Sequence, residues 1–195
     1  LQAIKNDINV ISMHLNLDCA SSGIDYYLAK GLGGEKLTII EEMTKGVGYG
    51  KSFCVDVSLK DFVKDIKTNF SSDKIIYYGN DDSRVKSVAS FCGAGGSYIS
   101  KYLEKGMLNE GTVISSDLPH HVIKALIESG KNVIVIPHYV AEEYGFNKFY
   151  LDVEKTLLGK VQTEYFCDEN YKYQEPTEFK ADINNWIVNR LNKTI

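Results

Sequence analysis

Short apolar runs alternate along this chain with longer segments in which apolar residues recur at helical spacing. The short runs are rich in β-branched residues, which favour strands, whereas the longer segments are typical of helices that cover one face of a sheet. This alternation predicts an α/β fold of layered sheets with covering helices. The expected strands are residues 8–14, 52–57, 74–78, 85–91, 112–116 and 132–137, and the expected helices are residues 24–33, 59–70, 98–106 and 120–130.

Composition excludes several classes of protein. The chain has 195 residues, of which 44% are hydrophobic, so it can bury one good core or two small ones. Its net charge of −4 offers no basic stripe, and we do not expect nucleic acid as a main partner. No apolar run approaches the roughly 20 residues of a membrane span. The four cysteines form no CxxC pair, which favours a reduced, cytoplasmic setting over a zinc ribbon or a disulfide framework.

The two ends of the chain differ from the part between them. The chain starts with leucine a few residues before the first expected strand, so we expect that an upstream part is missing. Residues 171–195 open with polar residues and continue with apolar residues at helical spacing, which predicts an amphipathic helix used in packing or oligomer contacts. We therefore expect the residues that carry chemistry to lie between these ends.

Two polar clusters follow expected strands that are far apart in the sequence. His14 and Asp18 come at the end of the first strand, and His138 and Glu142 follow the last one. Each cluster offers an imidazole and a carboxylate four residues apart, and such ligands suit a divalent metal ion. Molecules and ions that α/β proteins bind lie beyond the carboxyl ends of the strands, so we expect both clusters to meet at one metal site. Taken alone, Asp18 is more typical of a turn or a helix cap.

A glycine-rich turn joins an expected strand to an expected helix at residues 92–97. Free backbone N–H groups and the helix dipole would let Gly93, Gly95 and Gly96 contact an anion. The alternative, which stays open, is that these glycines only permit a tight turn and close helix packing.

A second glycine-rich stretch, residues 46–50, is expected to form a turn before a strand. Its end, Gly50 followed by Lys51, resembles a phosphate-binding P-loop. That motif requires a glycine where Lys45 stands, and it requires a helix afterwards. A strand is expected there instead, so we predict no P-loop.

Four segments together resemble one known family. They are MHLNLDCASSGIDYYLAKGLG, FCGAGGSYI, SSDLPHHVIKAL and IPHYVAEEYG, in the order found in the Nif-three-like family of dinuclear-metal proteins, also called GTP cyclohydrolase I type 2 homologues. The resemblance covers about residues 8–167. It implies two similar α/β lobes and a toroidal homohexamer. The metal-site lobe would be residues 1–46 with 134–195, and the second lobe residues 47–133.

The resemblance also implies roles for single residues. Asp18, His138 and Glu142 would bind the metal ions, and His14 and His121 would lie near the metals as acid/base or supporting groups. The family further uses two adjacent histidines from an earlier segment, which this chain does not contain. The ligand set predicted for this chain is therefore incomplete.

These residues lead to one main hypothesis and two alternatives. The main one is a metal-dependent hydrolase with two divalent ions per subunit, zinc, manganese or iron, which acts on a nucleotide or another small anionic molecule. The first alternative is a metal-containing assembly or regulatory module without turnover. The second is a nucleotide-binding domain that uses the glycine turn. The expected partners are a small anionic ligand and further copies of the chain in a hexamer.

Overall fold

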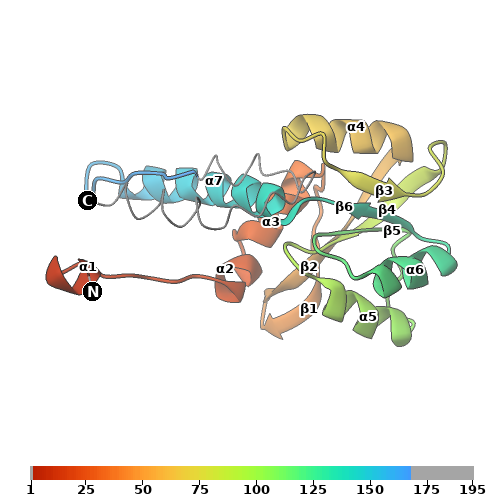
Figure 1. Ribbon diagram of the computed structural model, residues 1–195, viewed down its shortest axis with the longest axis horizontal. Coiled ribbons are helices and arrows are strands. Elements are labelled where there is room, and N and C mark those ends of the chain that lie inside the picture. Colours follow the sequence, from red (N-terminus) through yellow and green to blue (C-terminus); the bar gives the residue numbers. More distant parts are fainter. Residues whose placement is uncertain (1, 168–195) are drawn as a thin grey trace, which may run out of the picture.

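The computed structural model describes residues 2–167 of the chain. The strands are β1 (Thr38–Thr44), β2 (Val47–Ser58), β3 (Ile76–Tyr78), β4 (Arg84–Ser90), β5 (Thr112–Ser115) and β6 (Asn132–Val135). They form one six-stranded sheet in the order β1-β2-β4-β5-β6-β3 (Figure 1). β4, β5 and β6 are parallel to one another, and the other pairs are antiparallel. The predicted α/β class is confirmed.

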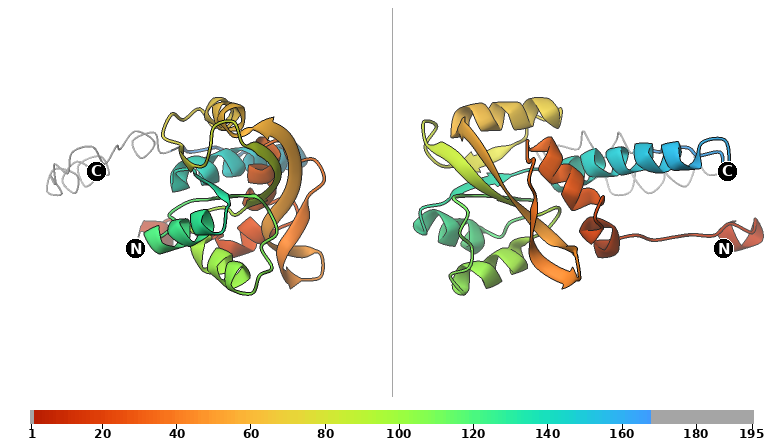
Figure 2. Two further views of the ribbon diagram at one scale, coloured as in Figure 1. Left: turned by 90° about the vertical axis from the view of Figure 1, so that its right-hand side faces the viewer. Right: turned by 180° about the vertical axis from the view of Figure 1, so that it is seen from behind.

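Helices cover both faces of this sheet (Figure 2). Val88 and Ile134 belong to the core on one face, whereas their chain neighbours Ala89 and Val133 belong to the core on the other. Successive strand residues point to opposite faces, so a strand buried on both sides carries apolar residues at neighbouring positions. The covering helices are α3 (Ile24–Gly31) and α4 (Leu59–Asn69) on the first face and α5 (Gly96–Glu104) and α6 (His120–Glu128) on the second.

The helix α7 (His138–Leu157) follows β6 and extends far beyond the sheet (Figure 1). It begins directly after Pro137, and proline is common at the start of helices. Its first half packs on α3 through Gly145, where an added Cβ would lie 2.7 Å from the Cγ2 atom of Ile24. This close crossing fixes the position of the first turns of α7.

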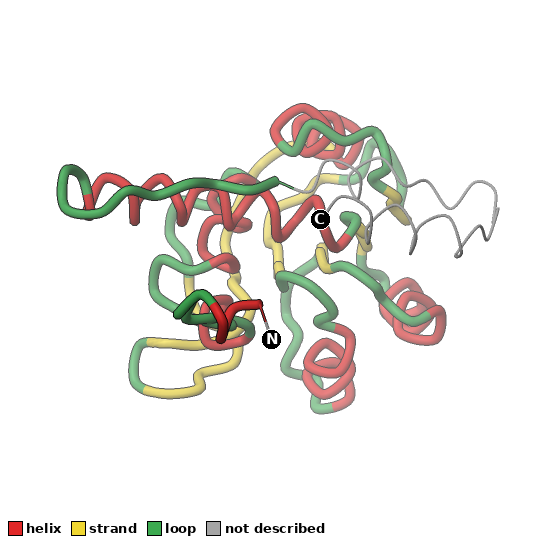
Figure 3. The backbone as a smooth tube through the Cα atoms, turned by 60° about the vertical axis from the view of Figure 1, so that its left-hand side comes forward, coloured by secondary structure: helices red, strands yellow, loops and turns green. Residues whose placement is uncertain are grey.

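The strand predicted for residues 8–14 is wrong. An extended stretch without strand pairing joins α1 (Gln2–Lys5) to α2 (Leu15–Cys19) (Figures 1 and 3). Val10 and Ile11 are each 80% exposed in it. β-branched residues stabilise a strand only where a neighbouring strand pairs with it and covers them. Within residues 2–167 this segment has no such neighbour.

The turn predicted for residues 46–50 is also wrong in part. β2 begins at Val47 and runs through these glycines, paired with β1, a strand that we did not predict. Gly48 lies so close to β1 that an added Cβ would be 2.1 Å from the carbonyl oxygen of Glu41. Gly50 has a positive φ of 73° and packs against the ring of Phe91. Close packing, and not a loop, explains both glycines.

The sheet takes strands from both of the predicted lobes. The boundary after residue 46 falls between the paired strands β1 and β2, and the boundary before residue 134 falls inside β6. The division into two lobes stays a prediction, and the helix predicted within residues 171–195 lies outside the described residues. No helix in residues 2–167 is long and apolar enough to cross a membrane.

Candidate metal centre

The parallel strands β4, β5 and β6 bring three polar residues to one edge of the sheet. Cys92 follows β4, Asp117 follows β5 and His138 follows β6. The carboxyl ends of neighbouring parallel strands meet at the same edge, which is where α/β folds hold their ligands. The position of His138 is therefore the one that the sequence predicts.

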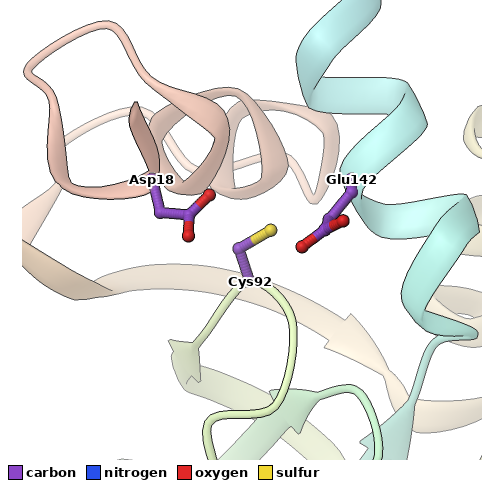
Figure 4. Close-up of side chains that lie close together, drawn as sticks. All are labelled: Asp18, Cys92 and Glu142. Atoms are coloured by element: carbon purple, nitrogen blue, oxygen red, sulfur yellow. The ribbon is translucent and has the colours of Figure 1, made fainter. Parts of the chain in front are cut away.

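Asp18 reaches this edge from the helix α2 and not from the end of a strand. Its neighbours Leu17 and Cys19 are buried, so they anchor the short helix and leave Asp18 half-buried beside the core. The ligand atoms of Asp18, Cys92 and Glu142 all lie within 4.8 Å of one another (Figure 4). The structure thus brings the two predicted carboxylates together and adds a thiol that the sequence analysis missed.

His138 lies next to this cluster at the start of α7. Its Nε2 atom is 2.9 Å from Oε1 of Glu142, one helical turn further along. Its Nδ1 atom is hydrogen-bonded to the carboxylate of Asp117. A carboxylate that accepts the Nδ1 proton is a common partner of histidines that bind metals. Nε2, which donates to Glu142 when the ring is protonated, becomes the ligand atom once its proton leaves.

The pKa values of the cluster reflect burial and the proximity of two carboxyl groups. Burial, and then the charge of Glu142, raise the pKa of Asp18 to about 6. Burial lowers the pKa of His138, but its hydrogen bonds to Asp117 and Glu142 outweigh this effect and leave that pKa raised. Burial, and then the nearby carboxylates, raise the pKa of Cys92 well above its ordinary value. A divalent cation would offset this repulsion, and donors of carboxylate, imidazole and thiol type fit one.

The glycine turn after β4 lies directly against the cluster. Gly93 has a φ of 63°, and an added Cβ would lie 3.1 Å from Nε2 of His138 and 3.4 Å from Oε1 of Glu142. The N–H of Gly95 donates to a serine hydroxyl at 3.0 Å, and Gly96 packs on a proline ring. These contacts fit the tight-turn explanation, and the anion contact of the three glycines stays a prediction.

A buried ion pair supports this turn. Asp25 on α3 is fully buried, and its Oδ2 atom is 3.4 Å from Nζ of Lys51 on β2. The Oδ1 atom of Asp25 accepts the backbone N–H of Cys92 at 2.9 Å. Lys51 also donates to the carbonyl of Gly48 at 2.7 Å, so its ammonium group has hydrogen-bond partners inside the protein. This pair could not be predicted from the sequence, because a charged residue on a helix is usually exposed.

A cavity of about 440 Å³ opens beside the two carboxylates. Asp18, Glu142 and His14 line it together with apolar side chains such as Phe146. His14 therefore lies beside the same cavity as the two carboxylates, and its acid/base role stays a prediction. His121 is exposed on α6 and is not among the residues that line this cavity, so its catalytic role stays a prediction.

Comparison with known proteins identifies proteins that are similar in sequence and one that is similar in structure. The GTP cyclohydrolase 1 type 2 homolog of Clostridium acetobutylicum is 26% identical over 147 residues, which are 73% of this chain and 54% of that protein. The homolog of Clostridium perfringens is 25% identical over 183 residues, 92% of this chain and 67% of that protein. The crystal structure of Staphylococcus aureus hypothetical protein SA1388 matches with a TM-score of 0.70 and 22% identity, over 88% of this chain and 70% of that one.

These comparisons differ in what they establish. This chain spans about half of the length of the first relative and about two thirds of the second. The likeness to the solved structure, at its level of identity, shows the fold alone. The family model of Duf34/NIF3 (NGG1p interacting factor 3) matches residues 1–172, which is most of the chain, and this protein therefore belongs to the DUF34/NIF3 family.

Proposed function

We propose that this protein is a metal-dependent hydrolase that binds divalent ions through Asp18, His138 and Glu142 and acts on a small anionic molecule. The convergence of Asp18 and Glu142 on one half-buried cavity is the observation that supports it most. Burial, and then the charge of Glu142, raise the pKa of Asp18 to about 6, so the ionised form of Asp18 is unfavourable there. Perturbed ionisable groups in a cavity are typical of functional sites.

Other parts of the fold hold each of these ligands in place. Asp117 accepts a hydrogen bond from the ring of His138 and directs the opposite nitrogen toward Glu142. The close crossing at Gly145 fixes the first turns of α7, from which His138 and Glu142 project. A carboxylate has two oxygens and can bridge two ions, so Asp18 and Glu142 suit the pair of zinc, manganese or iron ions in this proposal.

Divalent ions, when bound, supply a Lewis acid that activates water and stabilises developing negative charge. The residues of the chain would do the remaining work. His14 would accept or donate a proton, because it lines the same cavity as Asp18. Apolar residues such as Phe146 would exclude bulk water from the bound molecule. The cavity, at about 440 Å³, falls in the range of about 300–1,000 Å³ typical of small-molecule sites.

For the substrate we propose a nucleotide or a similar small anion. The name of the two clostridial relatives, GTP cyclohydrolase 1 type 2 homolog, supports a purine nucleotide as the first compound to test. The position of the glycine turn, for which we predict an anion contact, supports the same class. The turn lies beside the candidate ligands, since an added Cβ at Gly93 would be 3.1 Å from Nε2 of His138 and 3.4 Å from Oε1 of Glu142.

A second candidate is a metal-containing assembly module without turnover. Exposed apolar side chains favour it: Val10 and Ile11 precede α2, and Leu151 lies on the projecting part of α7. Apolar surface of this kind is typical of protein interfaces. In this proposal further copies of the chain, in a homohexamer, would cover that surface.

Turnover by metal-loaded protein separates the two candidates. The protein would be loaded with zinc, manganese or ferrous iron, its bound metal measured by mass spectrometry, and its activity assayed with GTP and a panel of phosphoesters. We expect Asp18→Asn to lower turnover by about 100-fold or more, because Asp18 would bind the ions directly and the loss of a residue that only orients a ligand already costs about 10–100-fold. Glu128→Gln, which changes an exposed carboxylate on α6, is the matched control.

The outcomes of this assay distinguish the enzyme from the module. Turnover that is lost in the Asp18 variant and kept in the control supports the enzyme. Absence of turnover from wild-type protein that is fully loaded with metal contradicts the enzyme and favours the module. Absence of bound metal from the wild-type protein contradicts both.

A further inference from the structure

The thiol of Cys92 has the surroundings of a ligand. Its sulfur lies within 4.8 Å of ligand oxygens of both Asp18 and Glu142, and the three side chains point toward one another (Figure 4). The residue is only 2% exposed, so the sulfur is buried while it faces two polar groups. Cys92 also belongs to the apolar core on the first face, but packing alone does not require a cysteine to lie within ligand distance of two carboxylates.

The backbone of Cys92 is fixed on both sides. Its N–H donates to the buried carboxylate of Asp25 at 2.9 Å, and its carbonyl accepts a hydrogen bond from the hydroxyl of Tyr49. The turn that follows begins with Gly93, whose φ is 63°. With these contacts the sulfur is held at the edge of the cluster, and a rigid first shell of this kind is what a metal site requires.

We propose that Cys92 is a further metal ligand and that its thiolate makes the centre prefer zinc or ferrous iron to manganese. The proposal rests on the proposed function, in which Asp18 and Glu142 hold a divalent ion. Thiolates select softer ions such as zinc, whereas carboxylates alone suit manganese and magnesium. Each ion that binds through the sulfur displaces one thiol proton, which leaves to solvent.

Cobalt(II) is the probe that tests this ligand directly. A cobalt ion bound to a thiolate shows a sulfur-to-metal charge-transfer band in the near ultraviolet, whereas cobalt bound by oxygen and nitrogen shows only its weak visible bands. We expect that band in the wild-type protein and its loss in Cys92→Ser, with cobalt still bound. Cys54→Ser is the control, because Cys54 is an exposed free cysteine on β2 and is not a member of the cluster.

Competition between metals provides a second measurement. We expect Cys92→Ser and Cys92→Ala to weaken zinc binding by at least about 10–100-fold, because the loss of a residue that only orients a ligand already costs that much, and to change manganese binding much less. Near-ultraviolet circular dichroism of the metal-free variants checks that they fold, and the alanine variant serves if the serine variant does not.

The possible results separate this inference from the proposed function. Cobalt that is bound without a charge-transfer band, or a band that persists in both Cys92 variants, overturns the role of Cys92 and leaves the metal centre intact. An equal loss of zinc and manganese affinity overturns the proposed selectivity. Absence of bound cobalt, measured by dialysis, overturns the metal centre and the cysteine ligand with it.

Discussion

At the scale of single residues, substitution of Gly93 tests how tightly the glycine turn packs on the cluster. Gly93 and Gly106 have the same φ of 63°, but an added Cβ meets Nε2 of His138 at 3.1 Å in the first case and nothing within 4 Å in the second. An L-residue in this conformation costs about 1–2 kcal/mol. We expect Gly106→Ala to lower the free energy of unfolding by about that amount. Gly93→Ala should lower it further and should also weaken zinc binding.

Urea unfolding and zinc titration of the two variants check this expectation. Gly106→Ala is the control for backbone strain, so only the excess loss in Gly93→Ala reports crowding at the cluster. Equal losses of stability, with zinc affinity unchanged in both variants, would contradict the packing described for Gly93.

Asp18 gives a second test at this scale, in metal-free protein. Burial and Glu142 raise its pKa from 3.8 to about 6, so in this window the folded state keeps a proton that the unfolded state has released. Stability therefore falls as the pH rises through the window. Asp18→Asn removes this penalty, and we expect it to raise the melting temperature more above about pH 7 than below about pH 4. Scanning fluorimetry with a chelator measures the effect, and a difference that is constant with pH would refute it.

At the scale of elements, the Asp25–Lys51 pair joins α3 to β2 and holds the start of the glycine turn. Both side chains are buried, so removal of one leaves the other charge without its partner. We expect Asp25→Asn or Lys51→Met to cost about 3–5 kcal/mol of stability, and the double variant to cost less than the sum of the two. Breaking the exposed pair of Asp56 and Arg84 is the control and should cost far less.

A double-mutant cycle by urea unfolding measures this coupling. Additive losses would show that Asp25 and Lys51 contribute independently, against the geometry. Because Asp25 also accepts the N–H of Cys92, its replacement should in addition weaken metal binding more than that of Lys51 does.

Elements specified by local contacts could be predicted from the sequence. The helix predicted for residues 59–70 agrees with α4 within one residue. Its N-cap residue Ser58 accepts the N–H of Asp61 at 3.2 Å, a contact between near neighbours in the chain. Residues 8–14 have equally strong local preferences, but a strand needs a partner from elsewhere, and none lies beside them within the described part of the chain.

At the scale of the whole molecule, the exposed apolar stretch before α2 is a candidate contact between copies of the chain. Val10 is 80% exposed, next to further exposed apolar residues, whereas Met107 is a 55% exposed apolar residue in the loop after α5. If copies of the chain associate through this stretch, Val10→Glu should shift the protein to smaller species, and Met107→Glu should not. Size-exclusion chromatography with light scattering measures the mass. A mass unchanged in both variants would contradict this mode of assembly.

The candidate site shows the same division between local and distant information. Asp18, His138 and Glu142 could be selected from the sequence because ligand-type residues follow apolar runs there. Cys92 and Asp25 could not, because nothing in their local sequence indicates which distant groups they face. Their roles come from neighbours that are close in space and far apart in the chain.

The sequence by itself determined the α/β class, the positions of four covering helices and two of the three residues, Asp18 and Glu142, that lie together as candidate metal ligands. Periodicity and capping act between residues a few positions apart, so they can be read without knowing the fold. The tertiary structure alone decided that residues 8–14 are not a strand, that glycines lie inside β2, and that a buried thiol faces Asp18 and Glu142. Pairing, close packing and burial depend on distant partners, and only the folded chain brings those partners together.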